Sequence, residues 1–115
     1  MIKSFRDIEA YQRSKQLYPQ VVKLTKDFPP AGFHLRDQVC RSGNAIHSDI
    51  AEGYGRSVSE FKMYLTRALG SNNETISHLE DARNANFCAA SEADSLITEY
   101  TIVGKQIYRL KEHWH

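Results

Sequence analysis

The chain has 115 residues, of which 41% are hydrophobic and 25% are charged, so we expect one globular domain with a packed core. Its net charge of +1 excludes a strong overall field toward nucleic acid or membranes, and no apolar run is long enough to form a membrane span or a signal peptide. The two cysteines, Cys40 and Cys88, lack CxxC spacing, so we expect free thiols in a cytoplasmic protein.

The first predicted helix runs from about Asp7 to Phe28, with a wide apolar face that is typical of a helix contacting more than one neighbour. Its predicted apolar residues are Ala10, Tyr11, Leu17, Tyr18, Val21, Val22, Leu24 and Phe28. Ser4 and Asp7 have the spacing of a capping box, with Asp in place of Glu. Pro19 lies on the polar face inside this segment, where it either bends or breaks the helix.

Proline and glycine at positions 29, 30 and 32 end the first helix, and a second is predicted over about Leu35–Tyr54. Its core residues are Leu35, Val39, Ser42, Ile46 and Ile50. The Gly-Tyr-Gly run at 53–55 lacks the preceding strand and the Lys-Ser/Thr pair of a phosphate-binding loop. We interpret it as the C-terminal end of this helix.

Ser57 and Glu60 form a second capping-box pattern, which starts a third helix that continues to about Asn86. Its core residues are Phe61, Leu65, Ala68, Leu69, Ile76 and Leu79. Ser91 and Asp94 are predicted to start a fourth helix. That helix buries Leu96, Tyr100, Val103, Ile107, Leu110 and Trp114. Short connections make consecutive helices antiparallel, so the sequence predicts a single all-α domain, an up-down-up-down antiparallel four-helix bundle.

Small, uncharged residues lie on the expected outer faces of the second and third helices. On the second helix they are Asn44, Ser48, Ala51 and Gly55, and on the third they are Met63, Thr66, Gly70 and Ser77. Small side chains in register allow another backbone to come close, and glycine in mid-helix costs about 1 kcal/mol relative to alanine. These eight residues are the predicted oligomer interface, against the alternative of an ordinary solvated surface.

Polar residues also fall within or beside the predicted core. Asn72 lies in the core of the third helix, and Asp49 borders that of the second, so the two are predicted to form a polar core network. Glu52 and Arg56 are spaced as an i, i+4 ion pair. The histidines and acids lack the spacing of a metal site, and no nucleophile–base arrangement is visible. We therefore expect a protein that is not an enzyme, with no metal, cofactor or small-molecule substrate.

The run Ile46–Arg56, followed by Ala68–Glu74, resembles the four-helix bundle proteins also called 23S rRNA intervening-sequence proteins, or the S23 family. The opening residues Phe5–Tyr11 are similar too, so the resemblance covers nearly the whole chain. His47 and Asp49 stand where that family usually has Pro and Asn. The resemblance implies a cytosolic homo-oligomer, with a ring-shaped pentamer favoured.

The same resemblance implies a link to RNA, because many genes of the family lie inside ribosomal RNA intervening sequences. Related accessory subunits of reverse transcriptases bind nucleic acid and look strongly basic, whereas this chain is not. Residues 1–56 nevertheless hold nine basic and six acidic residues, a net +3, and residues 57–115 hold six and eight, a net −2. Candidate RNA or DNA contacts are Lys3, Arg6, Arg13, Lys23, Arg36 and Arg41. A self-assembling scaffold remains the first hypothesis, and weak, oligomer-dependent binding of RNA or DNA is the alternative.

Overall fold

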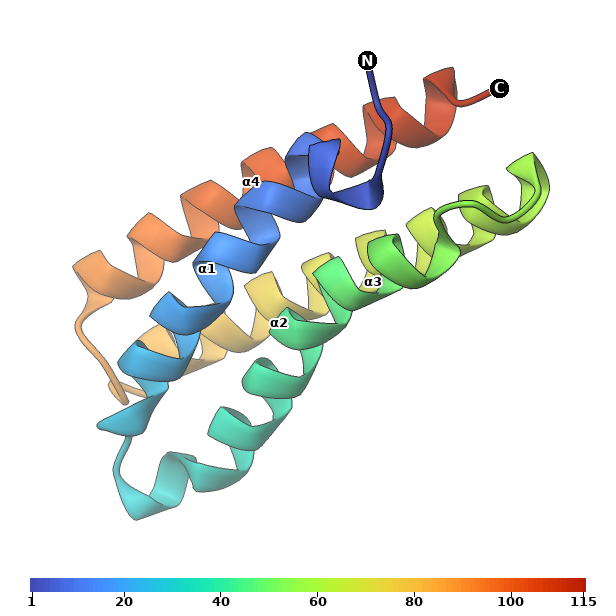
Figure 1. The fold of residues 1–115 in the computed structure, drawn as a ribbon. Helices are drawn as coiled ribbons and strands as arrows, with labels where there is room; N and C mark the ends of the chain where they lie inside the picture. The colour runs from blue at the N-terminus through green and yellow to red at the C-terminus, as the bar shows by residue number, and fades with distance from the viewer.

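The computed structural model describes all 115 residues and contains four long helices and no strand. They are α1 (Glu9–Lys26), α2 (Phe33–Gly53), α3 (Val58–Asn84) and α4 (Ala90–His113), with two short 3₁₀ turns at Phe5–Asp7 and Pro30–Gly32. Each helix packs against its neighbours in the chain, and α1 also packs against α4. Both termini therefore lie at one end of an elongated bundle measuring 44 × 21 × 18 Å (Figure 1). The predicted four-helix bundle is confirmed.

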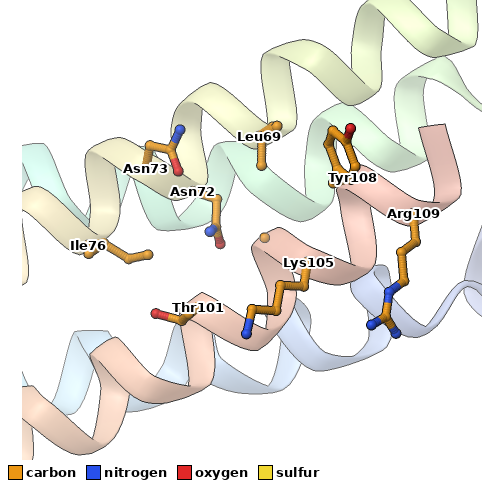
Figure 2. A pocket seen from close by; sticks show the side chains of 9 residues that line it. Leu69, Asn72, Asn73, Ile76, Thr101, Lys105, Tyr108 and Arg109 are labelled. Carbon is orange, nitrogen blue, oxygen red and sulfur yellow. The ribbon is translucent and has the colours of Figure 1, made fainter. Parts of the chain in front are cut away.

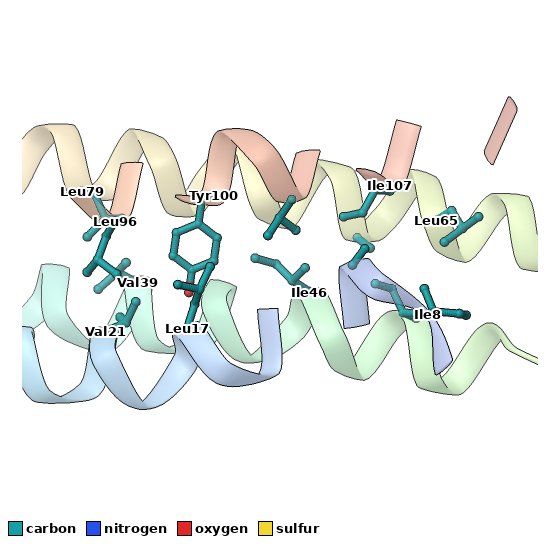
Figure 3. Packing of buried hydrophobic residues seen from close by; sticks show 14 of the residues in the cluster. Ile8, Leu17, Val21, Val39, Ile46, Leu65, Leu79, Leu96, Tyr100 and Ile107 are labelled. Carbon is teal, nitrogen blue, oxygen red and sulfur yellow. The ribbon is translucent and has the colours of Figure 1, made fainter. Parts of the chain in front are cut away.

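One continuous cluster of buried side chains runs along the bundle axis, with contributions from all four helices (Figure 3). Nearly every predicted core residue is buried or half-buried, because a 3.6-residue repeat places these residues on one face. Val22 is an exception, since its side chain is 42% exposed on α1. The apolar face of α1 is therefore narrower than the sequence predicts.

The ends of the helices agree with most of the predicted caps. Ser4 and Asp7 form a capping box, but around the first 3₁₀ turn rather than α1 itself. Ser57 Oγ accepts from the backbone N–H of Glu60 at the start of α3. Pro19 is exposed and α1 continues through it without a break. The two cysteines are free, as predicted.

The predicted cap of α4 at Ser91 is wrong. The N-cap is Ala89, two residues before Ser91, so the helix begins at Ala90, and no side chain caps it. Asp94 instead accepts a hydrogen bond from Arg83 Nη1 at 2.7 Å, which ties the end of α3 to the start of α4. The carboxylate that was expected to cap α4 is therefore used between the two helices.

Candidate functional site: the outer surfaces of α2 and α3

The predicted small residues of α2, which we call the α2 stripe (Asn44, Ser48, Ala51 and Gly55), are exposed except for Ala51, which is half-buried. Ser48 Oγ donates to the carbonyl of Ala45 in its own helix. Asn44 lies two turns after Asp37, which lines a groove between α1 and α2. The α2 stripe therefore borders the α1–α2 side of the bundle.

The corresponding residues of α3, which we call the α3 stripe (Met63, Thr66, Gly70 and Ser77), are all exposed, and Met63 is 53% exposed. A Cβ added to Gly70 would find no atom within 4 Å, so packing inside the chain does not require glycine there. Thr66 and Ser77 lie seven residues before and four after Asn73, which lines a groove between α3 and α4. The α3 stripe therefore borders the α3–α4 side.

A polar seam separates the two stripes, so they do not join into one surface. Along this seam Tyr64 Oη donates to Glu52 Oε1 at 3.5 Å, and the Arg67 guanidinium lies 5.2 Å from the centre of the Tyr64 ring. Burial raises the pKa of the Asp49 carboxyl, while nearby Arg67 acts in the opposite direction and Glu52 reinforces the rise. The seam thus gathers charged groups from both helices between the two uncharged stripes.

The predicted ion pair between Glu52 and Arg56 does not form. Arg56 Nε donates to the backbone carbonyl of Glu52 at 3.0 Å, and its Nη1 lies 3.7 Å from Glu60 Oε2. The reason is that α2 ends at Gly53, so Glu52 and Arg56 are not on one helix. Gly55 follows with a φ of +87°, a backbone conformation that favours glycine, and reverses the chain into α3.

Asn72 is fully buried, as predicted, but its partner is not Asp49. The side-chain Nδ2 donates to the backbone carbonyl of Tyr100 at 2.9 Å, which crosses from α3 to α4. Asp49 lies on the opposite, α2 side of α3, where its charged neighbour is Arg67. The predicted polar core network is therefore replaced by a bond between a side chain and the backbone.

His47, which the sequence marked only as a departure from the usual Pro of the family, is a buried residue. It is 5% exposed and lies edge-on to two rings of α1, with ring centres 6.2 Å from Tyr11 and 5.7 Å from Tyr18. Burial, helped by the positive charge of Lys15, lowers its pKa to about 4. Its side chain is thus a neutral packing element between α1 and α2. Tyr11 and Tyr18 lie two helical turns apart on one face of α1. This pair was the feature of the sequence from which an aromatic environment for His47 could have been inferred.

The six basic candidates for nucleic-acid contact do not form one patch. Arg13 points toward α4 and pairs with Glu99 at 3.1 Å. Lys3 and Arg6 lie at the beginning of the chain, whereas Lys23 and Arg36 lie near the opposite end of α1. Lys23, Lys26 and Arg36 line the groove of about 530 Å³ between α1 and α2, where Asp37 is the only acid. Arg41 is exposed on α2 beyond this groove.

No group of three or more His, Cys, Asp or Glu side chains is placed to hold a metal ion. None of the four helices is both long enough and apolar enough to cross a membrane.

The arrangement of the helices defines an all-α protein of the four-helix bundle class. Residues 6–109 match the 23S rRNA-intervening sequence protein family, and the chain belongs to that family. No curated protein gives a match to the chain.

Among solved structures, the chain is similar to a protein of unknown function from the S23 ribosomal protein family of Bacteroides thetaiotaomicron VPI-5482, whose crystal structure was determined at 1.70 Å resolution. The match has a TM-score of 0.83 and 24% sequence identity, and it covers 90% of this chain and 98% of the other. At this identity the similarity shows a shared fold.

Proposed function

We propose that the protein is a non-enzymatic scaffold that assembles with copies of itself, most simply as a pentameric ring. The copies meet through the α2 stripe and the α3 stripe. Because the polar seam separates these stripes, each molecule offers two different contact surfaces. Contact between unlike surfaces is heterologous, and heterologous contacts close into rings when the rotation between copies permits. The separation of the stripes thus supports a ring over a two-fold dimer.

The observation that carries this proposal is Gly70. An exposed glycine in the middle of a helix costs about 1 kcal/mol relative to alanine. Nothing inside the chain explains that cost, since no atom lies within 4 Å of the position that its Cβ would occupy. Close approach of a second copy would explain the glycine. The same contact would cover the exposed Met63, which lies two turns before Gly70 on the same face of α3.

Light scattering coupled to size-exclusion chromatography tests the assembly. We expect an oligomer at micromolar concentration for the wild type and smaller species for Gly70→Trp and Ala51→Trp, with helical circular dichroism retained. Gln16→Trp is the matched control, because Gln16 is exposed on α1 outside both stripes and should leave the oligomer intact. A wild-type protein that is monomeric at these concentrations would refute the proposal.

A second candidate function, oligomer-dependent binding of RNA or DNA, is favoured by the basic groove between α1 and α2. Lys23, Lys26 and Arg36 line this groove on each copy, so a ring would repeat them along one strand. Gel-shift titrations at low and physiological salt test it, because phosphate contacts weaken steeply with salt. We expect weaker binding for Lys23→Ala than for Arg13→Ala, because Arg13 already pairs with Glu99, whereas Lys23 forms no ion pair within the chain. Absence of binding at low salt rules this function out.

A further inference from the structure

The bases that line the α1–α2 groove lie at the end of the bundle where α1 finishes and α2 begins. Lys23, Lys26 and Arg36 line this groove of about 530 Å³. Val22, which is 42% exposed, also lines it. Neither lysine forms an ion pair within the chain, and Arg36 approaches only its sequence neighbour Asp37, at 3.6 Å. The groove therefore keeps an excess of positive charge beside an exposed apolar side chain.

Unpaired acids lie on the opposite, α3–α4 side of the molecule. Glu80 and Asp81 are exposed and form no ion pair within the chain. Arg83, the nearest arginine in sequence, already bonds to an acid of α4 at 2.7 Å. Asp81 follows Ser77 by one turn and so continues the α3 stripe. Glu80 follows Ile76 by one turn, and Figure 2 shows Ile76 extending from α3 on the side of α4.

The bases of the groove and these acids lie at the same level along the bundle axis. Ser42 of α2 and Thr75 of α3 are level with each other, because their hydroxyl oxygens are 2.8 Å apart. The two helices run in opposite directions with the same rise per residue. Arg36, six residues before Ser42, is therefore level with Asp81, six residues after Thr75. Lys26, the last residue of α1, lies at the same end of the bundle. In a ring whose axis runs along the bundle, level residues on opposite sides of neighbouring copies meet.

We propose that the α1–α2 groove of one copy receives the α3–α4 side of the next copy. Glu80 and Asp81 of that copy meet the bases Lys26 and Arg36, and the same contact covers the exposed Val22. The inference rests on the proposed scaffold function and assigns the charged part of the contact between copies. Opposite charges across an interface fix its register and disfavour like-charged pairings. A contact between two α1–α2 grooves would place bases against bases, so the charges favour head-to-tail assembly. The groove is then occupied by protein rather than by nucleic acid.

Reversing the charges on one side at a time tests this contact. The base-reversed variant combines Lys26→Glu with Arg36→Glu, and the acid-reversed variant combines Glu80→Lys with Asp81→Lys. Light scattering at low salt, where charges are least screened, measures assembly. We expect each variant alone to raise the dissociation constant of assembly by about tenfold or more, with helical circular dichroism retained. An equimolar mixture of the two variants should regain assembly, because each supplies the charge that the other has lost.

The matched control combines Lys3→Glu with Arg6→Glu, which reverses two exposed charges at the other end of the bundle and should leave assembly unchanged. A monomeric wild type would remove both the scaffold function and this inference. Suppose instead that the wild type assembles, but both reversed variants assemble equally well or their mixture stays dissociated. The groove contact is then wrong, although the scaffold function stands. A base-reversed variant that loses RNA binding in gel shifts but assembles like the wild type would assign the groove to nucleic acid and overturn the proposal.

Discussion

Gly53 of α2 packs directly against Tyr64 of α3. A Cβ added to Gly53 would lie 2.8 Å from Cγ of Tyr64 and still nearer to its Cβ, so only glycine fits this position without movement of α3. The same Tyr64 has the guanidinium groups of Arg56 and Arg67 within 4.9 and 5.2 Å of its ring centre, and its hydroxyl donates to Glu52. The polar seam that separates the two stripes is therefore built on this helix–helix contact.

Gly53→Ala should destabilise the fold by about 1–3 kcal/mol, the usual cost of overpacking a buried contact. The tyrosine and the α3 backbone would have to move, since the clash is with Cβ and Cγ rather than with the flexible end of the side chain. Urea denaturation followed by circular dichroism measures the change. An unchanged midpoint would show that the end of α2 adjusts freely at Gly53.

Gly43→Ala is the matched change in the same helix, and we expect the opposite sign. A Cβ at this position would lie 3.7 Å from both Tyr100 Oη and Tyr18 Cδ1, an ordinary contact distance. Alanine is favoured over glycine inside a helix by about 1 kcal/mol. The denaturation midpoint should rise, and a fall would mean that the space beside Gly43 is needed by these tyrosines.

His47 should make the fold less stable as the pH falls from about 6.5 to 4. Its folded pKa is lowered to about 4, so in this window the unfolded chain binds a proton that the folded chain excludes. The stability present above pH 6.5 is therefore lost progressively, by roughly 3 kcal/mol in all, and the loss levels off below pH 4. His47→Phe keeps an aromatic ring between Tyr11 and Tyr18 and should flatten this slope.

The comparison of the two proteins isolates His47 from the carboxyl groups that also titrate in this range. Denaturation midpoints of wild type and His47→Phe should converge with rising acidity or cross in favour of the variant. Parallel pH profiles would show that His47 is protonated without cost in the folded protein.

Ala89→Ser should stabilise α4 by about 1 kcal/mol, because the present N-cap supplies no side-chain acceptor for the first N–H groups. Thermal unfolding measures the gain. Ser91→Ala is the control and should change little, since Ser91 is exposed and does not cap the helix. A larger loss from Ser91→Ala than gain from Ala89→Ser would contradict the assigned start of the helix.

The helices and their buried faces could be predicted from the sequence because both depend on local spacing. Buried apolar residues, such as Ile46 in α2 and Leu65 in α3, recur every three to four residues within each helix. Ser57 caps α3 by accepting from a backbone N–H within the first turn. Asp94 takes no part in the cap predicted at Ser91, since its carboxylate accepts a hydrogen bond from Arg83, eleven residues before it. Such a partner on another helix is invisible to local spacing.

The exposure of the candidate interface residues was predictable from the sequence, but their arrangement on the surface was not. Small side chains on α2 and α3 could be recognised in each helix separately, and they are exposed as expected apart from Ala51. Their separation by Arg67 and Glu52 depends on how α2 rotates against α3, which the Gly53–Tyr64 contact sets. Likewise, the Asn72 side chain donates to the backbone carbonyl of Tyr100. A sequence pattern cannot show this bond, because every residue has a backbone carbonyl.

Trp114 is the only tryptophan of the chain, and it packs edge-on against Phe61 at 4.7 Å and Tyr54 at 6.1 Å between ring centres. It therefore closes the end of the bundle where α2 turns into α3 and where α4 finishes. Its fluorescence reports on that end alone, whereas circular dichroism averages over all four helices. Fraying of the last turn of α4 would thus be recorded as an emission change that precedes the loss of helicity.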